Sequence, residues 1–469
     1  MVKGRIDMNE TATDKKDYTA TKNACKLCSP LGAALVFKGI RGAVPLLHGS
    51  QGCSTYIRRY LISHFKEPMD IACSNFAEET AIFGGGANLK IALENIRRQY
   101  APELVGVATT CLSETIGDDV PMFLREYREM FPDEDLPPVV HVSTPSYQGT
   151  HMQGFHGAVL ATVAALARGD APDGEAEGAL RINLFPGMVS PEDLRHLKEI
   201  LADLGVPAMV LPDYSRTLDG GLWTEYQRIP PGGTDADDIR RSGAAAASLE
   251  FGRILAGEKQ TAGTFLEKTF GVPCRRIGLP IGIRETDRLF EALTAVTGRP
   301  TPEKYIEERG RLTDALVDGH KIVNLKRAII YGEEDLVAGL AALLSEIGIV
   351  PVLCASGGKS GRLEKTIAGF FPDPAEKGIR VMENADFVDI EAAARELSPD
   401  LIIGHSKGYP LSRRIQVPLV RVGFPVHDRV GGARLLHVGY RGALALFDRI
   451  ANAFLERQQE DSSVGYTYM

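Results

Sequence analysis

The sequence predicts an α/β protein built from three Rossmann-like domains with mostly parallel sheets. Its 469 residues are too many for one hydrophobic core and indicate about three domains. Short runs rich in β-forming residues alternate with helical stretches, which is typical of βαβ units. We expect a mobile N-terminal arm at residues 1–20 and α/β domains at 21–178, 179–322 and 323–469, the last ending in a helix and a tail.

The first domain is predicted to contain a strand at residues 42–47 and helices near 54–65 and 87–99. Residues 104–110 form an apolar run that is typical of a buried strand. Because the strands are separated by helices, they are expected to pair in parallel.

The second domain is predicted to begin with a strand at residues 181–185. Ser190 then serves as the N-cap of a helix that has proline at its first position and an acidic first turn. A strand is expected at 207–211. Residues 216–245 are rich in Gly, Asp and Pro and predict an exposed excursion, and residues 246–257 are expected to be helical.

The third domain repeats the alternation. Strands are predicted at residues 327–332, 350–354 and 401–405, and a helix at 334–347. In such folds ligands bind in crevices at the carboxyl ends of the strands.

Composition excludes several classes of function. The formal net charge of −8 and the pI of about 5.8 give no support for a nucleic-acid-binding surface. No stretch approaches 18 uninterrupted apolar residues and the start lacks the apolar core of a signal peptide, so we expect a cytoplasmic protein that spans no membrane. Seven cysteines, an odd number, favour metal or thiol chemistry over a disulfide framework.

Three of these cysteines, Cys28, Cys53 and Cys111, stand in turns that follow apolar runs and are marked by glycine or proline. A thiolate at such a corner reaches outward while the backbone behind it stays fixed, as an iron–sulfur ligand requires. Three such corners predict one cluster.

Two of the corners also have a plainer interpretation. The turn before Cys53, residues 49–52, suits either backbone amides aimed at cluster sulfides or an anion-binding helix N-terminus with an incidental thiol. Cys111 closes an apolar strand, where a buried, inert cysteine is the usual case. None of the three corners carries the prediction without the others.

The other cysteines are interpreted differently. Cys25 forms a CxxC pair with Cys28, but no second CxxC or downstream histidine pair completes a structural zinc site, so Cys25 is expected to be an accessory residue. Cys73, Cys274 and Cys354 lie in or beside apolar runs and are expected in the core.

Two further patterns are expected to be structural. His48 and His64 are of a kind that more often supports a fold than binds a metal. The run 357–360, Gly-Gly-Lys-Ser, resembles the end of a phosphate loop, but a P-loop needs a glycine where Leu353 stands. ATP hydrolysis by a Walker A motif is therefore not expected.

Taken together, an ordered series of motifs resembles the β-type subunits of nitrogenase component 1. The motifs are Cys-Ser-Pro-Leu-Gly-Ala (28–33), Pro-Leu-Leu-His-Gly-Ser-Gln-Gly-Cys (45–53), His-Phe-Lys-Glu-Pro (64–68), Phe-Gly-Gly (83–85), Thr-Thr-Cys-Leu-Ser-Glu-Thr-Ile-Gly-Asp-Asp (109–119), Ser-Thr-Pro-Ser-Tyr (143–147) and Val-Pro-Leu-Val-Arg-Val-Gly-Phe-Pro-Val-His-Asp-Arg (417–429). The resemblance covers about residues 23–455.

The resemblance implies an oxidoreductase subunit with the nitrogenase component 1 fold. By motif, Cys28, Cys53 and Cys111 match ligands of an eight-iron, seven-sulfur P-cluster, or a related iron–sulfur cluster, shared with three cysteines of a homologous α-type subunit. Ser146 matches a serine that can ligate the oxidised cluster. Also implied are an α2β2 heterotetramer, electron delivery by an ATP-dependent iron–sulfur reductase, and an iron–sulfur catalytic cofactor in the α subunit; no catalytic residue is expected in this chain.

The substrate is suggested by residues 55–64, which resemble the nitrogenase-like reductases more than the dinitrogen enzymes. Among those reductases, the resemblance as a whole leads us to expect a methylthio-alkane reductase, which cleaves carbon–sulfur bonds of small thioethers. The alternatives are a dinitrogen-reducing β subunit, a β-like subunit of a cofactor-assembly scaffold, and a thiol-bearing Rossmann-type protein without a cluster. Scaffold subunits generally do not keep all three cysteines, which are present here.

Overall fold

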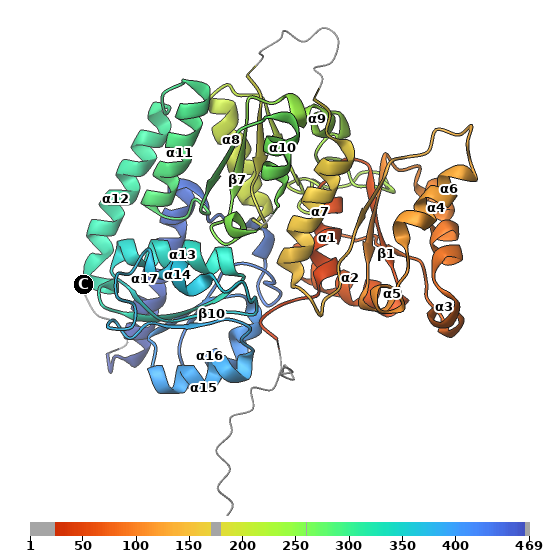
Figure 1. The fold of residues 1–469 in the computed structure, drawn as a ribbon. Coiled ribbons are helices and arrows are strands. Elements are labelled where there is room, and N and C mark those ends of the chain that lie inside the picture. Colours follow the sequence, from red (N-terminus) through yellow and green to blue (C-terminus); the bar gives the residue numbers. More distant parts are fainter. Residues whose placement is uncertain (1–23, 170–179, 259, 465–469) are drawn as a thin grey trace, which may run out of the picture.

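The computed structural model describes residues 24–169, 180–258 and 260–464. The arm predicted at residues 1–20 lies outside this range, as does the end of the predicted tail. The described chain forms three separate parallel sheets with helices packed around them, as the sequence predicts (Figure 1). No described helix combines the length and the apolar character needed to cross a bilayer.

The first sheet has the strand order β2-β1-β3-β4, and every neighbouring pair is parallel. The predicted strands and helices are present with shifts of one to three residues at their ends. The elements of this part of the chain are α1 (Ser29–Lys38), β1 (Ala43–His48), α2 (Gln51–Phe65), β2 (Ala72–Cys73), α3 (Glu78–Phe83), α4 (Gly86–Tyr100), β3 (Leu104–Thr109), α5 (Cys111–Ile116), α6 (Val120–Glu129), β4 (Val139–Val142) and α7 (His151–Leu166).

The second sheet has the order β6-β5-β7-β8 and is also parallel. Its helix α8 begins at the predicted proline, and the Ser190 hydroxyl accepts a hydrogen bond from the Asp193 amide. The elements are β5 (Ile182–Phe185), α8 (Pro191–Asp203), β6 (Ala208–Val210), α9 (Ala236–Arg240), the 3-10 turn η1 (Arg241–Ala244), β7 (Ala247–Phe251), the 3-10 turn η2 (Leu255–Gly257), α10 (Ala262–Phe270), β8 (Cys274–Ile277), α11 (Ile283–Thr297) and α12 (Glu303–Val323).

The prediction of a helix at 246–257 is wrong, because this stretch contains strand β7. Ala, Leu and Glu favour a helix locally, but β7 is buried along its whole length between β5 and β8, and tertiary packing decides. Glu250 is accommodated there because it accepts hydrogen bonds from the Thr261 hydroxyl (2.7 Å) and the Gly263 amide (3.3 Å). The excursion predicted at 216–245 is exposed only in its first half, since α9 packs back against α7.

The third sheet has the order β11-β10-β9-β12-β13, again parallel throughout. Helices α13 and α14 cover one face and α15 and α16 the other (Figure 1). The predicted helix at 334–347 is confirmed. The elements are β9 (Arg327–Gly332), α13 (Glu334–Ile347), β10 (Val350–Ser356), α14 (Leu363–Ala368), β11 (Arg380–Met382), α15 (Phe387–Leu397), β12 (Leu401–Gly404), η3 (Ser406–Gly408), α16 (Tyr409–Ile415), β13 (Leu419–Arg421), η4 (Gly432–Arg434) and α17 (Gly439–Asp461).

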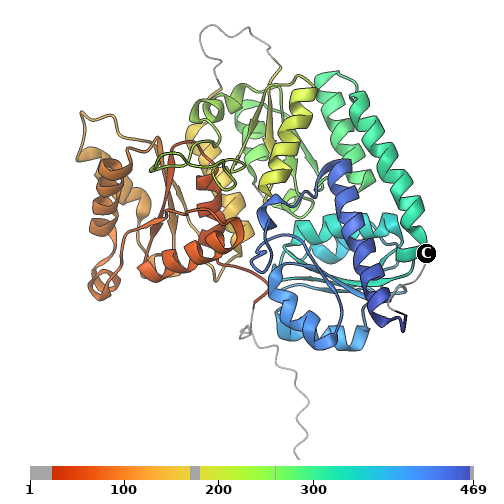
Figure 2. The same ribbon diagram turned by 180° about the vertical axis from the view of Figure 1, so that it is seen from behind.

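The C-terminal helix α17 joins the second and third sheets. It packs against α11 and α12 at one side and against β13 at the other, and Figure 2 shows it running across the back of the molecule. The first sheet stands apart from this pair, and its helices contact the pair through α7, which packs against α9 and α10, and through α2, which packs against η4.

Candidate metal centre

Cys28 lies at the N-cap of α1, and close packing of α1 on α7 fixes its place. A Cβ atom on Gly154 of α7 would stand 1.9 Å from the carbonyl oxygen of Ser29, so only glycine allows this approach. The Leu27 carbonyl accepts a hydrogen bond from the His151 amide at 3.0 Å. Cys28 is thereby held beside the loop that precedes α7.

Cys53 and Cys111 come from the loops that follow two neighbouring strands. Cys53 lies in the first turn of α2 after β1, and Cys111 is the first residue of α5 after β3. The His48 carbonyl at the end of β1 accepts hydrogen bonds from the Thr110 amide (3.1 Å) and the Ser113 hydroxyl (2.8 Å). The two loops are therefore bound to each other at the carboxyl edge of the first sheet.

Ser146 connects the corner of Cys28 with the corner of Cys111. Its hydroxyl oxygen accepts a hydrogen bond from the Ser29 amide at 3.0 Å, and its amide donates to the Cys111 sulfur at 3.3 Å. Burial raises the pKa of the Cys28 thiol, a hydrogen bond with Ser146 lowers it, and the charges of Cys111 and Cys53 raise it again. The structure thus brings all four predicted residues together.

The donor set fits a sulfur-rich iron cluster better than a single ion. All three cysteines are free, with Cys111 exposed and the other two partly buried. Within the described ranges, no group of three or more His, Cys, Asp or Glu side chains is arranged to hold one metal ion. Thiolates at helix N-termini are favoured by the helix dipole, and a cluster of several irons spans more widely spaced thiols than one ion does.

Exposed apolar side chains are close in sequence to three of the site residues. Tyr56, Leu112 and Tyr147, each within three residues of a site residue, are exposed to 40%, 37% and 61%. Exposed apolar side chains gathered at one place indicate a surface that a partner covers.

The remaining cysteines are separate from this site. Cys25 is buried with its sulfur 3.8 Å from His405 Nε2, and burial raises the pKa of its thiol to about 12. Cys354 is fully buried, as predicted, whereas Cys73 and Cys274 are only partly buried beside the core. Both β2 and β8 are edge strands of their sheets, which explains the remaining exposure.

The two histidines have structural partners. His48 is fully buried, with Nδ1 3.0 Å from the Ser74 hydroxyl and Nε2 3.0 Å from Asp118. His64 accepts a hydrogen bond from the Val426 amide at 2.9 Å, and burial lowers the pKa of its imidazole to about 3. His48 thus joins β1 to the loops that contain Ser74 and Asp118, and His64 joins α2 to the segment that contains Val426.

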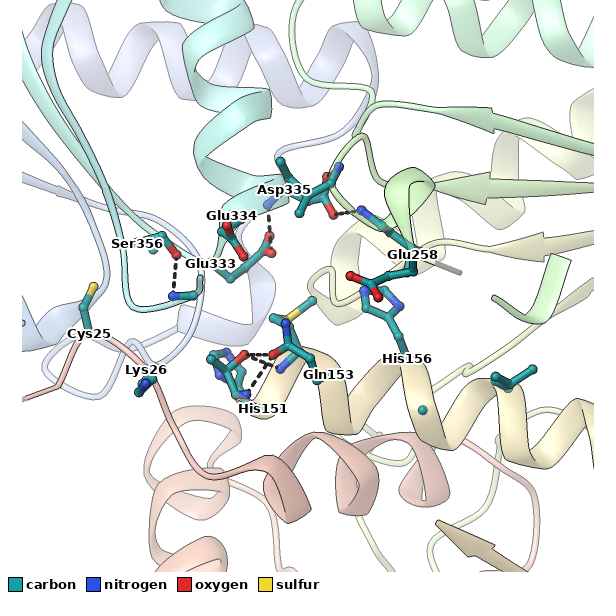
Figure 3. Close-up of a pocket in the computed structure, with 18 of the residues that line it drawn as sticks. Cys25, Lys26, His151, Gln153, His156, Glu258, Glu333, Glu334, Asp335 and Ser356 are labelled. Atoms are coloured by element: carbon teal, nitrogen blue, oxygen red, sulfur yellow. Dashed lines mark hydrogen bonds between the residues drawn. The ribbon is translucent and has the colours of Figure 1, made fainter. Parts of the chain in front are cut away.

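A cavity of about 210 Å³ at the junction of the three sheets was not predicted from the sequence. Figure 3 shows Glu333, Glu334 and Asp335, at the start of α13, across from His151 and His156 of α7. Its place at the carboxyl ends of β9 and β10 follows the general rule for Rossmann folds, which could have located it. The three acids are already engaged by backbone amides or by Ser360.

The segment 357–360 is not a phosphate loop. It follows β10, in which Leu353 is buried, and the Ser360 hydroxyl donates to Glu334 at 2.6 Å. No helix starts at Lys359 or Ser360, as a P-loop would require. This segment therefore does not form a Walker A site.

Comparisons with known proteins identify relatives over nearly the whole chain. The family model of nitrogenase component 1 type oxidoreductases matches residues 28–455. The nitrogenase molybdenum-iron protein beta chain of Clostridium pasteurianum is 34% identical over 441 residues, which cover 94% of both chains. The nitrogenase iron-molybdenum cofactor biosynthesis protein NifN of Bradyrhizobium diazoefficiens is 33% identical and covers 94% of this chain and 92% of its own. A solved structure of nitrogenase Cp1 at pH 6.5 superposes with a TM-score of 0.91 at 33% identity, covering 97% of this chain and 98% of that chain.

Proposed function

Because this chain belongs to the nitrogenase component 1 type oxidoreductases, as a β-type subunit, we propose that it holds one half of an iron–sulfur cluster at a subunit interface. Cys28, Cys53 and Cys111 are the ligands from this side, and a homologous α-type subunit supplies the others in an α2β2 heterotetramer. The observation that carries the proposal is the convergence of three free thiols and Ser146 at the carboxyl edge of the first sheet, with exposed apolar residues next to them in the sequence.

The proposed role is electron relay. A P-cluster, once bound, supplies reversible one-electron storage between an ATP-dependent iron–sulfur reductase and the catalytic cofactor of the α-type subunit. The chain itself fixes the thiolates at helix N-termini, whose dipoles stabilise negative charge. Ser146 holds the Ser29 amide through its hydroxyl oxygen, so its ligation of an oxidised cluster would release that amide and the hydroxyl proton.

The test is anaerobic purification of the chain with and without an α-type partner, with iron counting and electron paramagnetic resonance. The pair is expected to carry iron and to need ATP and a separate reductase for turnover. The chain alone is expected to be poorly soluble or to self-associate, because the thiols and their apolar surround are left open to water. A well-folded, iron-free pair that turns over would contradict the proposal.

For the substrate, we propose a small thioether, which makes the complex a methylthio-alkane reductase. The proposal is supported by residues 55–64, which resemble the nitrogenase-like reductases as a group and form most of α2, the helix that carries Cys53. Release of a thiol and an alkane from a methyl thioether, measured with the purified complex and its reductase, tests it. Reduction of dinitrogen without thioether cleavage would instead identify a nitrogenase β subunit.

A role in a cofactor-assembly scaffold is the second candidate, favoured by the similarity to NifN. The two roles differ in turnover. A scaffold complex would bind a cluster and pass a cofactor to another protein but reduce no substrate, whereas a reductase complex would show catalytic turnover. The presence of all three cysteines favours the reductase.

A further inference from the structure

An open groove with a volume of about 510 Å³ lies between the second and third sheets, away from the cysteine site. Arg253, which follows β7, and Arg284 and Arg288, from the first two turns of α11, line one side. Arg362 and Lys365, at the start of α14, line the other. Five cationic side chains thus gather in one groove of a chain whose net charge is −8.

The arginines are held in place by contacts beneath the groove. Glu285 is 2% exposed, and its Oε1 accepts hydrogen bonds from both Arg253 and Arg288 at 2.5 Å. The Arg253 guanidinium lies 5.3 Å from the centre of the Phe370 ring. Each guanidinium has five N–H donors, so one shared carboxylate oxygen leaves most of them available.

The cations of the groove outnumber the carboxylates that pair with them. Arg284 pairs with Glu346 at 3.2 Å and Arg362 with Glu258 at 3.0 Å, and Glu285 is shared. Lys365 has no ion pair among the described residues. Asp335 also interacts with Arg253, so the five cations face four carboxylates, and the positive charge that remains at the groove would attract an anion.

We propose that this groove binds a small organic phosphate. A phosphate monoester carries about −1.5 to −2 charges near neutral pH, and arginine is the side chain best suited to its oxygens. The groove is within the size range of pockets for drug-sized ligands, roughly 300–1,000 Å³, and far exceeds a single inorganic phosphate. The ligand bridges the second and third sheets.

The experiment is titration calorimetry of the whole purified complex with AMP, ribose 5-phosphate and inorganic phosphate, at low and moderate salt. AMP or ribose 5-phosphate is expected to bind at least tenfold more tightly than inorganic phosphate, and added salt is expected to weaken binding. The double variant Arg288→Gln/Lys365→Gln is expected to lose at least tenfold in affinity for the organic phosphate. The variant Arg311→Gln, an exposed arginine on α12, is the matched control and should bind as wild type does.

Melting temperatures of each variant show whether the fold is retained. If the double variant melts at a lower temperature than wild type, the single variant Lys365→Gln tests the proposal instead. Its exposed side chain has no ion pair to lose among the described residues, so the fold should be retained. This variant is expected to weaken binding of the organic phosphate about threefold. Equal affinity for inorganic and organic phosphate would show an unspecific anion site and overturn the proposal. Unchanged AMP binding in Lys365→Gln and the double variant would also overturn it.

Discussion

Helices α1 and α2 beside the first sheet differ from α8 and α13 beside the other two sheets in the groups that accept hydrogen bonds from their first amides. Helices α8 and α13 each have two acidic residues in the first turn. In α13 the Glu333 carboxylate accepts hydrogen bonds from the first amides of the helix. In α8 the Ser190 hydroxyl does so, and the Asp193 carboxylate accepts hydrogen bonds from the His437 and Val438 amides. Helices α1 and α2 have no acidic residue in the first turn and, as the structure describes them, no side chain that caps them. They carry cysteines instead. Since the first amides of a helix need an acceptor, α8 and α13 supply their own, whereas α1 and α2 leave room for an external anion such as an iron–sulfur cluster.

The largest effect is expected from removing one of the three thiols. Cys53→Ala is expected to lose most of the iron at the interface, together with activity, because two remaining thiols cannot hold this half of a cluster. Iron per chain and the paramagnetic resonance signal of the anaerobic complex measure the loss. Cys274→Ala is the control and should keep both; full iron retention in Cys53→Ala would refute its assignment as a ligand.

The second test removes a buried acid that links α8 to the segment before α17. Asp193 in α8 is 1% exposed, accepts hydrogen bonds from the His437 and Val438 amides, and lies 3.2 Å from His437 Nδ1. Asp193→Ala is expected to lower the free energy of unfolding by about 3 kcal/mol, because a buried partner is left unpaired. Chemical denaturation measures it, and cluster content should not change in the folded fraction.

Glu192, the neighbour of Asp193, provides the matched control. It is partly exposed and pairs with Arg195, so Glu192→Ala should change stability by no more than about 0.5 kcal/mol. If both variants lost the same free energy of unfolding, the loss would come from removing a negative charge at the helix N-terminus and not from the buried contact of Asp193 with His437.

The third test is the pH dependence of the acid at α13. Burial, and after it the charge of Asp335, raise the pKa of Glu333 well above its ordinary value of 4.5. The folded chain therefore keeps a proton that the unfolded chain releases, and the stabilisation from this site falls as the pH rises from about 4.5 toward the raised pKa. Glu333→Gln cannot ionise and should gain stability relative to wild type across this window, by roughly 1 kcal/mol for each pH unit that the solution is raised.

Melting temperature against pH measures the difference. Glu364→Gln, an exposed acid in the first turn of α14, should run parallel to wild type. A Glu333→Gln curve that is also parallel to wild type would show that Glu333 is ionised in the folded protein.

The smallest expected effect belongs to Ser146, which sits between two thiol corners. Ser146→Ala should leave the reduced cluster intact but shift the spectrum or midpoint potential of its oxidised state, because a hydroxyl oxygen is no longer offered to electron-poor iron. Redox titration followed by paramagnetic resonance measures this change. If the oxidised spectrum and the midpoint potential of Ser146→Ala were the same as those of wild type, Ser146 would be only a turn residue that accepts a hydrogen bond from the Ser29 amide.

The sequence predicted the parallel sheets well because buried strands such as 104–109 and strongly periodic helices such as 334–347 have unambiguous local patterns. It failed at β7, where helix-forming residues are buried in the middle of a sheet. The turns that hold Cys28, Cys53 and Cys111 were predictable because glycine and proline mark them, whereas the role of these cysteines as ligands stays a prediction. The contacts of Ser146 with Ser29 and Cys111, and the cationic groove, join residues far apart in the chain and have no local signal.

The most direct measurement of the central claim is anomalous diffraction at the iron edge from anaerobic crystals of the chain with its α-type partner. The account predicts one compact group of iron peaks at the subunit interface, within bonding distance of the sulfur atoms of Cys28, Cys53 and Cys111. Iron absent from this sheet edge in an active complex, or bound to other residues of this chain, would contradict it.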